Sequence, residues 1–180
     1  MQLRTENEHR TPPVKRVALI GILLAFTLIM GLVERMIPLD GMVPGMRLGL
    51  ANLAIVISLY ALPTRDTLLL VVLKCLMMTI FSGSAIALLY SVTGSLSSLI
   101  IMLLLIKMKN VSVIGVSVAG AAFHNLGQIL IARFIFGSWG ILMYLPFLLI
   151  IGTVSGIVVG YLAKAVQKRI NSYFKSSHLQ

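Results

Sequence analysis

Several polar or ionisable residues of this 180-residue chain stand inside long apolar stretches, where their side chains need partners. They are Asn52, Lys74, His124, Asn125, Gln128 and Arg133. Amide, imidazole and ammonium groups are costly to bury in an apolar medium, so each one is a candidate for binding a solute or for bonding to another helix. Their nitrogens donate hydrogen bonds and the amide oxygens accept them, so these residues could bind a polar partner.

The densest group is His124, Asn125 and Gln128. On a helix, His124 and Gln128 share one face, and Asn125 lies about 100° from His124. Gly120 and Gly127 would let a helix or a ligand approach closely. Two interpretations are open, namely hydrogen bonds to other helices at about 1 kcal/mol each, or a cavity. Three polar groups within five residues favour the cavity.

A second group lies where a turn leads into an apolar stretch, in the segment Pro44 to Asn52 (PGMRLGLAN). The free backbone N–H groups of a helix N-terminus favour anions, and Arg47 adds a positive charge with several donors there. Arg47 either anchors the loop at lipid headgroups or contacts a ligand. Asn52, about a turn and a half further along, also needs a partner, which favours the ligand.

Lys74 and Arg133 are the two cations placed well inside apolar stretches. Lys74 lies about eight residues from the cytoplasmic end of its short stretch, roughly 12 Å at 1.5 Å per residue. A water-filled cavity, an anionic ligand and an extended side chain that reaches the headgroups are all open for it. Arg133 lies near the opposite helix face from His124, and we expect it to reach the headgroups.

Composition predicts the elements that must hold these residues. Hydrophobic residues make up 58% of the chain and charged residues 11%, against roughly a quarter in soluble domains, and the mean hydropathy is +1.01. This excludes an ordinary water-soluble domain and predicts an all-α polytopic membrane protein, a bundle of six transmembrane helices. The expected segments are 17–34, 48–62, 67–82, 84–106, 111–136 and 141–163.

The formal charge of +10 raises the question of a nucleic-acid partner, but the basic residues cluster in the two tails and in short loops, so we expect no nucleic-acid partner and interpret them as topology signals. Eleven basic residues fall on one side if the N-terminal tail is cytoplasmic, whereas only Arg35 and Arg47 fall on the other. The positive-inside rule then places both termini in the cytoplasm of a multi-pass plasma-membrane protein. We expect basic cytoplasmic tails at 1–16 and 166–180 around a membrane domain at 17–165.

This topology gathers the candidates at an outward-facing site. Three helices begin outside, and their positive dipole ends favour an anionic or strongly hydrogen-bond-accepting solute. The predicted substrate-binding residues are Arg47, Asn52, Lys74, Ser84, Tyr90, His124, Asn125 and Gln128. The longest outer loop is the expected lid, with Glu34, Asp40 and Gly45 as its residues.

Small residues predict where helices come close in lipid. In the last segment the expected packing residues recur every four positions, and in the first segment they mark a face for docking onto a partner. They are Gly152, Gly156 and Gly160 in the last segment, and Ala18, Gly21 and Ala25 in the first. Packing within the chain and docking onto another subunit are both open for each group.

The sequence lacks the catalytic motifs that such a chain would need for chemistry of its own. It contains no Walker A, Gly-x-Ser-x-Gly or HExxH pattern. Its single cysteine, Cys75, gives neither a disulfide nor a CxxC metal site. Asp40 and Asp66 stand in different loops, unlike the clusters that hold magnesium diphosphate. We expect a protein that is not an enzyme and uses no metal or other cofactor.

Two segments carry a resemblance to a known family. Pro44 to Asn52 and Ile114 to Gln128 (IGVSVAGAAFHNLGQ), together with Tyr60 and the Ser91 to Gly94 turn of helix, resemble the Gx transporter family. That family is also catalogued as heptaprenyl diphosphate synthase component I. The resemblance covers roughly residues 17 to 165. Arg47 and Lys74 replace an expected lysine and arginine, so the charges are kept.

The resemblance implies two different functions. The family is similar to the substrate-binding S components of energy-coupling factor transporters, which have six helices, an outer site under a first-loop lid, and a first helix that docks onto a transmembrane coupling subunit driven by ATPase subunits. This implies a subunit that takes up a small, anionic or polar nutrient. The synthase label implies instead an accessory membrane subunit for a soluble prenyl synthase in menaquinone side-chain biosynthesis.

Overall fold

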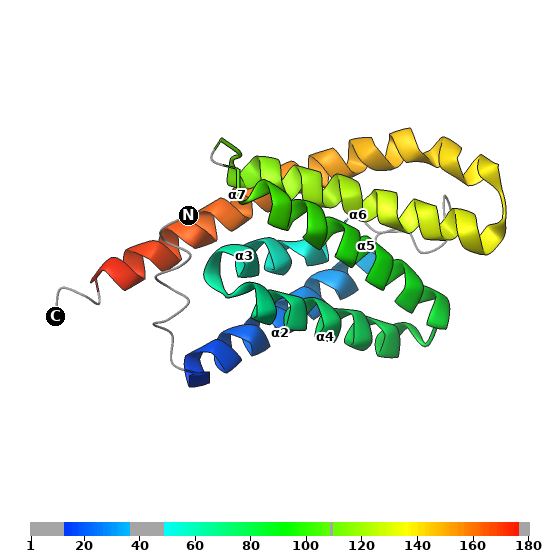
Figure 1. The fold of residues 1–180 in the computed structure, drawn as a ribbon. Helices are drawn as coiled ribbons and strands as arrows, with labels where there is room; N and C mark the ends of the chain where they lie inside the picture. Colours follow the sequence, from blue (N-terminus) through cyan, green and yellow to red (C-terminus); the bar gives the residue numbers. More distant parts are fainter. Residues whose placement is uncertain (1–12, 37–48, 109, 177–180) are drawn as a thin grey trace.

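The structure is a computed structural model that describes residues 13–36, 49–108 and 110–176. The predictions for Asp40, Gly45 and Arg47 lie outside these residues, as does most of each predicted tail. The described chain is helical, with no strand in it, so the all-α prediction is confirmed (Figure 1). Its elements are α2 (Pro13–Arg35), η1 (Leu50–Asn52), α3 (Leu53–Ala61), α4 (Thr64–Ser82), α5 (Ala85–Leu105), α6 (Val113–Phe136), η2 (Trp139–Tyr144) and α7 (Leu145–Ser176).

The helices end where the sequence provides turn residues. Gly83 and Gly137 adopt left-handed conformations, with φ of 63° and 67°, directly after α4 and α6. Glycine has no Cβ and therefore tolerates this conformation without strain. At the start of α6, the Ser112 hydroxyl accepts a hydrogen bond from the backbone N–H of Gly115 at 3.1 Å, which caps the helix.

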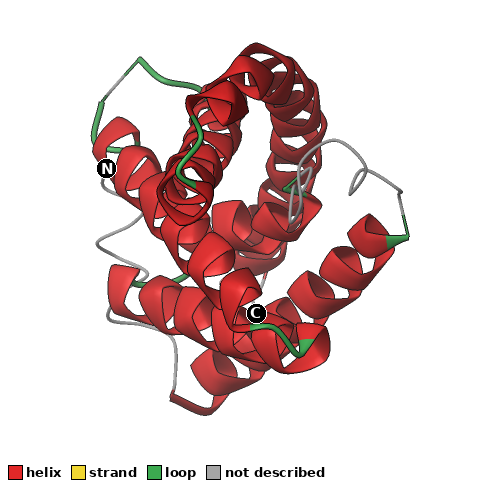
Figure 2. Cartoon of the chain, turned by 90° about the vertical axis from the view of Figure 1, so that its right-hand side faces the viewer, coloured by secondary structure: helices red, strands yellow, loops and turns green. Residues whose placement is uncertain are grey.

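The helices form two groups that pack face to face (Figure 1). In one group, α6 lies between α5 and α7 and packs along both. In the other, α2 contacts both α3 and α4, and α4 joins the groups by packing on α5. A view turned by 90° about the vertical axis shows helices joined by loops, with no strand in the described chain (Figure 2). The arrangement leaves α3 near the middle, in contact with both groups.

Helix α3 is the most deeply buried element. Seven of its nine residues are buried, from Leu53 to Leu59. With η1 the segment spans twelve residues, roughly 18 Å at 1.5 Å per residue, which is shorter than the ~30 Å hydrocarbon layer. Its apolar composition on all sides fits a position surrounded by other helices rather than one facing lipid.

Four helices are long and apolar enough to cross a membrane, as expected of a membrane protein. The candidate spans are Arg16–Glu34, Ala85–Leu105, Val113–Phe136 and Trp139–Arg169. Large hydrophobic side chains such as Ile22, Ile100 and Ile150 are exposed on them, and lipid is the solvent that suits such surfaces. Each of the six predicted segments overlaps one α-helix of the described chain, but six membrane crossings remain a prediction.

Glycines of α7 allow its close contact with α6. A Cβ at Gly156 would lie 2.7 Å from the Val118 Cα, and one at Gly160 would lie 2.7 Å from the Ile114 Cα. Both distances are below any normal contact, so only glycine permits this separation of the two backbones. Gly152 continues the same line. These predicted packing residues therefore lie against a helix of the same chain.

The small residues of α2 have different surroundings. Ala18, Gly21 and Ala25 are all exposed. A Cβ built at Gly21 would meet no other described atom within 4 Å. Within the described chain, this face of α2 is therefore not used for packing.

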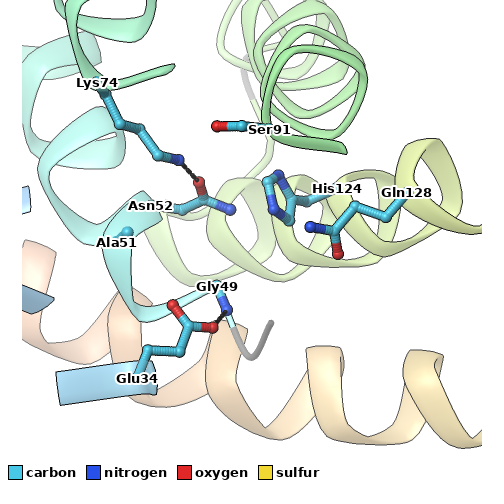
Figure 3. Close-up of a pocket in the computed structure, with 8 residues that line it drawn as sticks. All are labelled: Glu34, Gly49, Ala51, Asn52, Lys74, Ser91, His124 and Gln128. Atoms are coloured by element: carbon cyan, nitrogen blue, oxygen red, sulfur yellow. Dashed lines mark hydrogen bonds between the residues drawn. The ribbon is translucent and has the colours of Figure 1, made fainter. Parts of the chain in front are cut away.

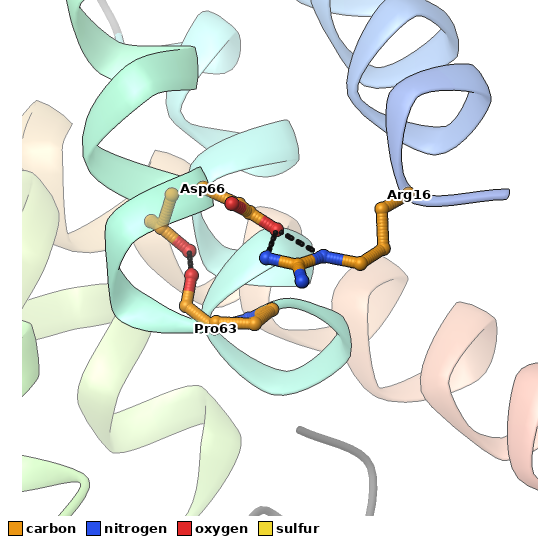
Figure 4. A network of polar contacts seen from close by, with 4 residues as sticks. Arg16, Pro63 and Asp66 are labelled. Atoms are coloured by element: carbon orange, nitrogen blue, oxygen red, sulfur yellow. Dashed lines mark hydrogen bonds and ion pairs between the residues drawn. The ribbon is translucent and has the colours of Figure 1, made fainter. Parts of the chain in front are cut away.

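Two arginines near helix ends find partners of different kinds. Arg16, in the first turn of α2, donates from Nε and Nη2 to Asp66 Oδ2 at 2.8 and 2.6 Å (Figure 4). Asp66 lies in the first turn of α4, where the carbonyl of Pro63 accepts its backbone N–H at 3.0 Å. Near the end of α6, the guanidinium carbon of Arg133 lies 4.0 Å from the centre of the Trp139 ring, a cation–π contact.

Candidate binding site

A polar pocket lies between the two groups of helices. Side chains and backbone from five elements and the turn before η1 line it (Figure 3). The lining residues are Glu34 of α2, Gly49, Ala51 and Asn52 at and before η1, Lys74 of α4, Ser91 of α5, and His124 and Gln128 of α6. Each of the polar side chains among them is at most 5% exposed. The polar groups of the pocket are therefore enclosed by the fold.

Lys74 supplies a cation to the pocket wall. Its Nζ donates to Asn52 Oδ1 at 2.9 Å and to Ser95 Oγ at 3.2 Å, and the side chain is 3% exposed. Removing an ammonium group from water costs several kcal/mol in practice. The amide and hydroxyl oxygens offset part of that cost by solvating the charge. Lys74 and its two partners thus tie α4 to η1 and α5.

Glu34 supplies an anion to the opposite end of the pocket (Figure 3). Its Oε1 accepts a hydrogen bond from the backbone N–H of Gly49. Gly49 has φ of 84°, a left-handed conformation that favours glycine, and it begins the turn into η1. The Glu34 carboxyl group, near the end of α2, therefore holds the backbone of Gly49 in place, just before Asn52.

His124 and Gln128 enter the pocket from α6, one helical turn apart. They face α5 at Gly94, where a Cβ would lie 2.8 Å from His124 Cε1 and 3.0 Å from Gln128 Cγ. The absence of a side chain at Gly94 makes room for both. Two successive residues of α5 therefore contribute to the site. Gly94 leaves space for His124 and Gln128, and Ser95 accepts a hydrogen bond from Lys74.

Two buried amide atoms in the pocket have no hydrogen-bond partner among the described residues. They are Asn52 Nδ2 and Gln128 Oε1. An unsatisfied buried polar atom costs about 1–3 kcal/mol. Both side chains line the same cavity, so a polar molecule in it would remove this cost.

The cavity is small as the walls stand. Its volume is about 10 Å³, which is about the room that one water molecule needs. A solute larger than water therefore requires movement of the walls. In the described part of the chain, no group of three His, Cys, Asp or Glu residues comes together to hold a metal ion.

One family model matches nearly the whole helical part of the chain. The family model of heptaprenyl diphosphate synthase component I matches residues 23–166. The chain belongs to this family. The recognition from sequence is thereby confirmed, and all residues that line the pocket lie inside the matched segment. No curated protein and no solved structure matches the chain.

Four of the predicted binding residues of this family member meet in the pocket, namely Asn52, Lys74, His124 and Gln128. They come from η1, α4 and α6, far apart in sequence. Each was singled out because a polar side chain in an apolar stretch needs a partner. In the structure all four side chains line the same pocket.

Three further predicted binding residues lie elsewhere. Asn125 faces α7, where its Nδ2 donates to the Leu148 carbonyl at 2.8 Å. Tyr90 is buried in α5, one residue before the pocket residue Ser91, and its hydroxyl has no partner among the described residues. Ser84 is the N-cap residue of α5 and does not line the pocket. Successive residues of a helix point about 100° apart, which separates Asn125 from His124 and Tyr90 from Ser91.

Glu34 requires a correction of its predicted place. It was expected in the lid loop, but it belongs to α2, is 4% exposed, and forms part of the pocket wall. The site therefore combines the Glu34 carboxyl group with the Lys74 amino group.

Ser91, Gly49 and Ala51 line the pocket but were not among the binding residues predicted from the sequence. A signal for Ser91 exists, because it recurs with Ser95 and Ser98 on one face of α5, and all three are buried. Gly49 and Ala51 contribute through their place in the backbone, and small residues beside a polar one carry no chemical signal of their own.

Proposed function

We propose that this chain is the substrate-binding membrane subunit of an energy-coupled uptake transporter, and that it holds a small polar solute in the pocket. The observation that supports this most strongly is the enclosure of Lys74, His124 and Gln128 within one cavity of an apolar helical bundle. Ionisable groups in such a setting are expensive and mark solute or ion sites by default. The two amide atoms without described partners give a solute something to bind.

The proposed arrangement in the plasma membrane has six spans and both termini in the cytoplasm. The charge distribution of the sequence supports this orientation. The short η1–α3 segment would be one of these spans although it is shorter than the hydrocarbon layer, because neighbouring helices rather than lipid surround it. The proposal leaves energy supply to ATPase subunits, which act through a transmembrane coupling subunit.

The outer face of α2 supports a docking role for that helix. Ala18, Gly21 and Ala25 are exposed there, and small residues let another helix approach closely in lipid. By contrast, the glycines of α7 already pack on α6. Replacing Gly21 by Leu would therefore weaken association with a coupling subunit while leaving the fold of this chain unchanged.

A second candidate function follows from the family name. A family described as component I of heptaprenyl diphosphate synthase points to a second component as its partner. In this alternative the chain is a membrane accessory subunit without catalysis of its own, and its pocket holds a diphosphate headgroup for a soluble prenyl synthase. Lys74 and His124 are the pocket residues with chemistry suited to a phosphate.

The experiment that separates the two candidates is purification of the full chain in lipid nanodiscs, followed by mass spectrometry of any small molecule released on denaturation. A retained water-soluble metabolite, lost in Gln128→Leu, supports the transporter subunit. Co-purification of a prenyl synthase, with loss of chain elongation when the gene is deleted, supports the alternative. Ser98→Ala is the matched control, because Ser98 is buried in α5 outside the pocket.

A further inference from the structure

The orientation of the Asn52 amide is set by Lys74. An ammonium group has three N–H donors and no acceptor, so the amide atom that faces it must be the oxygen. The 2.9 Å contact from Lys74 Nζ to Asn52 Oδ1 satisfies this requirement. The amide nitrogen must then point the other way, across the cavity toward His124 (Figure 3). Asn52 therefore offers a donor to whatever enters the pocket.

Gln128 offers an acceptor to the same cavity. Its Oε1 is buried and has no hydrogen-bond partner among the described residues, and the side chain lies on the far side of His124 from Asn52 (Figure 3). Both side chains line the cavity, so its wall contains one unsatisfied donor and one unsatisfied acceptor. A molecule that satisfies both must itself carry an acceptor and a donor.

The charges of the pocket argue against a simple ion. Lys74 and Glu34 place one charge of each sign in the wall. An anion that approaches Lys74 must also lose its water beside the Glu34 carboxylate, and a cation that approaches Glu34 meets the Lys74 ammonium. A molecule with no net charge avoids both unfavourable terms.

We propose that the pocket selects a small molecule that is uncharged or zwitterionic overall and presents an acceptor to Asn52 and a donor to Gln128. This inference rests on the proposed solute-binding function and names the class of solute. Lys74 is then a positioning residue, because it acts on the solute through the amide that it orients. The donor of Asn52 is the group that determines specificity.

The test measures thermal unfolding of the full chain in lipid nanodiscs with four small probes at equal concentrations. The probes are β-alanine and 2-pyrrolidinone, which carry both a donor and an acceptor, acetate, which carries acceptors alone, and methylammonium, which carries donors alone. We expect a concentration-dependent rise in Tm with one or both of the first pair and none with the second pair. A rise with acetate or methylammonium alone, or with none of the four, overturns the inference.

Asn52→Asp is the decisive variant. It keeps the shape of the side chain and its contact with Lys74 but replaces the donor by an acceptor. We expect the concentration of the effective probe at half-saturation to increase at least about tenfold, the value of one lost hydrogen bond to a buried group. Lys74→Met frees the amide to rotate and should cause a smaller increase. The matched control Ser98→Ala should bind as the unmodified chain does.

The outcomes distinguish this inference from the proposed function. If mass spectrometry finds a retained metabolite that is a simple anion, solute binding stands and the selectivity proposed here fails. If Asn52→Asp folds and binds the effective probe unchanged, the role of the Asn52 donor is wrong. If no metabolite is retained and no probe binds, the proposed function fails as well.

Discussion

Gly156 of α7 lies so close to Val118 of α6 that a Cβ on the glycine would be 2.7 Å from the Val118 Cα. Because the obstructing atom belongs to the backbone, Gly156→Ala must move the two helices apart. We expect the free energy of unfolding to fall by about 1–3 kcal/mol, the usual cost of overpacking. Reversible unfolding of the purified chain in mixed micelles measures this change.

Gly21→Ala is the matched control for that prediction. It is the same substitution in another long apolar helix, but a Cβ at Gly21 would meet no other described atom within 4 Å. Its free energy of unfolding should stay the same or rise by about 0.4–1 kcal/mol, because alanine restricts the unfolded chain. Equal losses in the two variants would show that close packing of α6 and α7 does not explain the role of Gly156.

Gly94→Ala tests the pocket in a similar way. A Cβ there would press on side-chain atoms of His124 and Gln128, at 2.8 and 3.0 Å. Side chains can turn aside, so we expect a small loss of stability and a large loss of solute retention. Gly127→Ala provides the contrast, because its Cβ would lie 2.7 Å from the Thr93 backbone carbonyl oxygen. That variant should lose stability first. Unfolding and solute retention should be measured for both variants. Full retention of solute by Gly94→Ala would contradict the pocket geometry.

The two buried asparagines should behave differently. Asn125 donates to the Leu148 carbonyl at 2.8 Å and lies outside the cavity, whereas Asn52 lines it. Asn125→Ala should therefore lower the free energy of unfolding by about 0.5–1.5 kcal/mol, since it removes a buried hydrogen bond between α6 and α7. The folded fraction should bind the effective probe with unchanged affinity. A loss of affinity in Asn125→Ala, with stability unchanged, would return Asn125 to the site.

The helical segments could be predicted from the sequence because their boundaries depend on local signals. Gly83 and Gly137 end two of them, and long apolar runs define the rest. The polar residues of α6 were predictable for the same reason, since a histidine and a glutamine in an apolar run stand out. What local signals do not give is the direction of each side chain. Asn125 follows His124 directly, yet it serves the packing of α7 because the helix turns it away.

Glu34 shows the other limit of local signals. It stands at the end of an apolar stretch, before a segment rich in proline and glycine, where a carboxylate is normally expected in water. Its burial depends on the return of the chain at Gly49, fifteen residues later, to supply a backbone donor. The short helix α3 shows the same limit. Its apolar sequence is compatible with a membrane span and with a buried core helix, and periodicity alone does not distinguish the two.

The ion pair of Arg16 and Asp66 joins the first helix to the start of α4 and gives the last prediction. Their atoms lie 2.6 Å apart, and the side chains are 33% and 14% exposed. Such a partly exposed pair contributes about 0.5–1 kcal/mol, reduced by salt. A double-mutant cycle with Arg16→Gln and Asp66→Asn should yield a coupling energy of this size. Arg65→Gln removes the same charge from an exposed neighbouring position, and its coupling to Asp66→Asn should be close to zero. Equal coupling in both cycles would mean that Asp66 responds to the general positive charge of this end of the molecule, and that the contact with Arg16 does not hold α2 against α4.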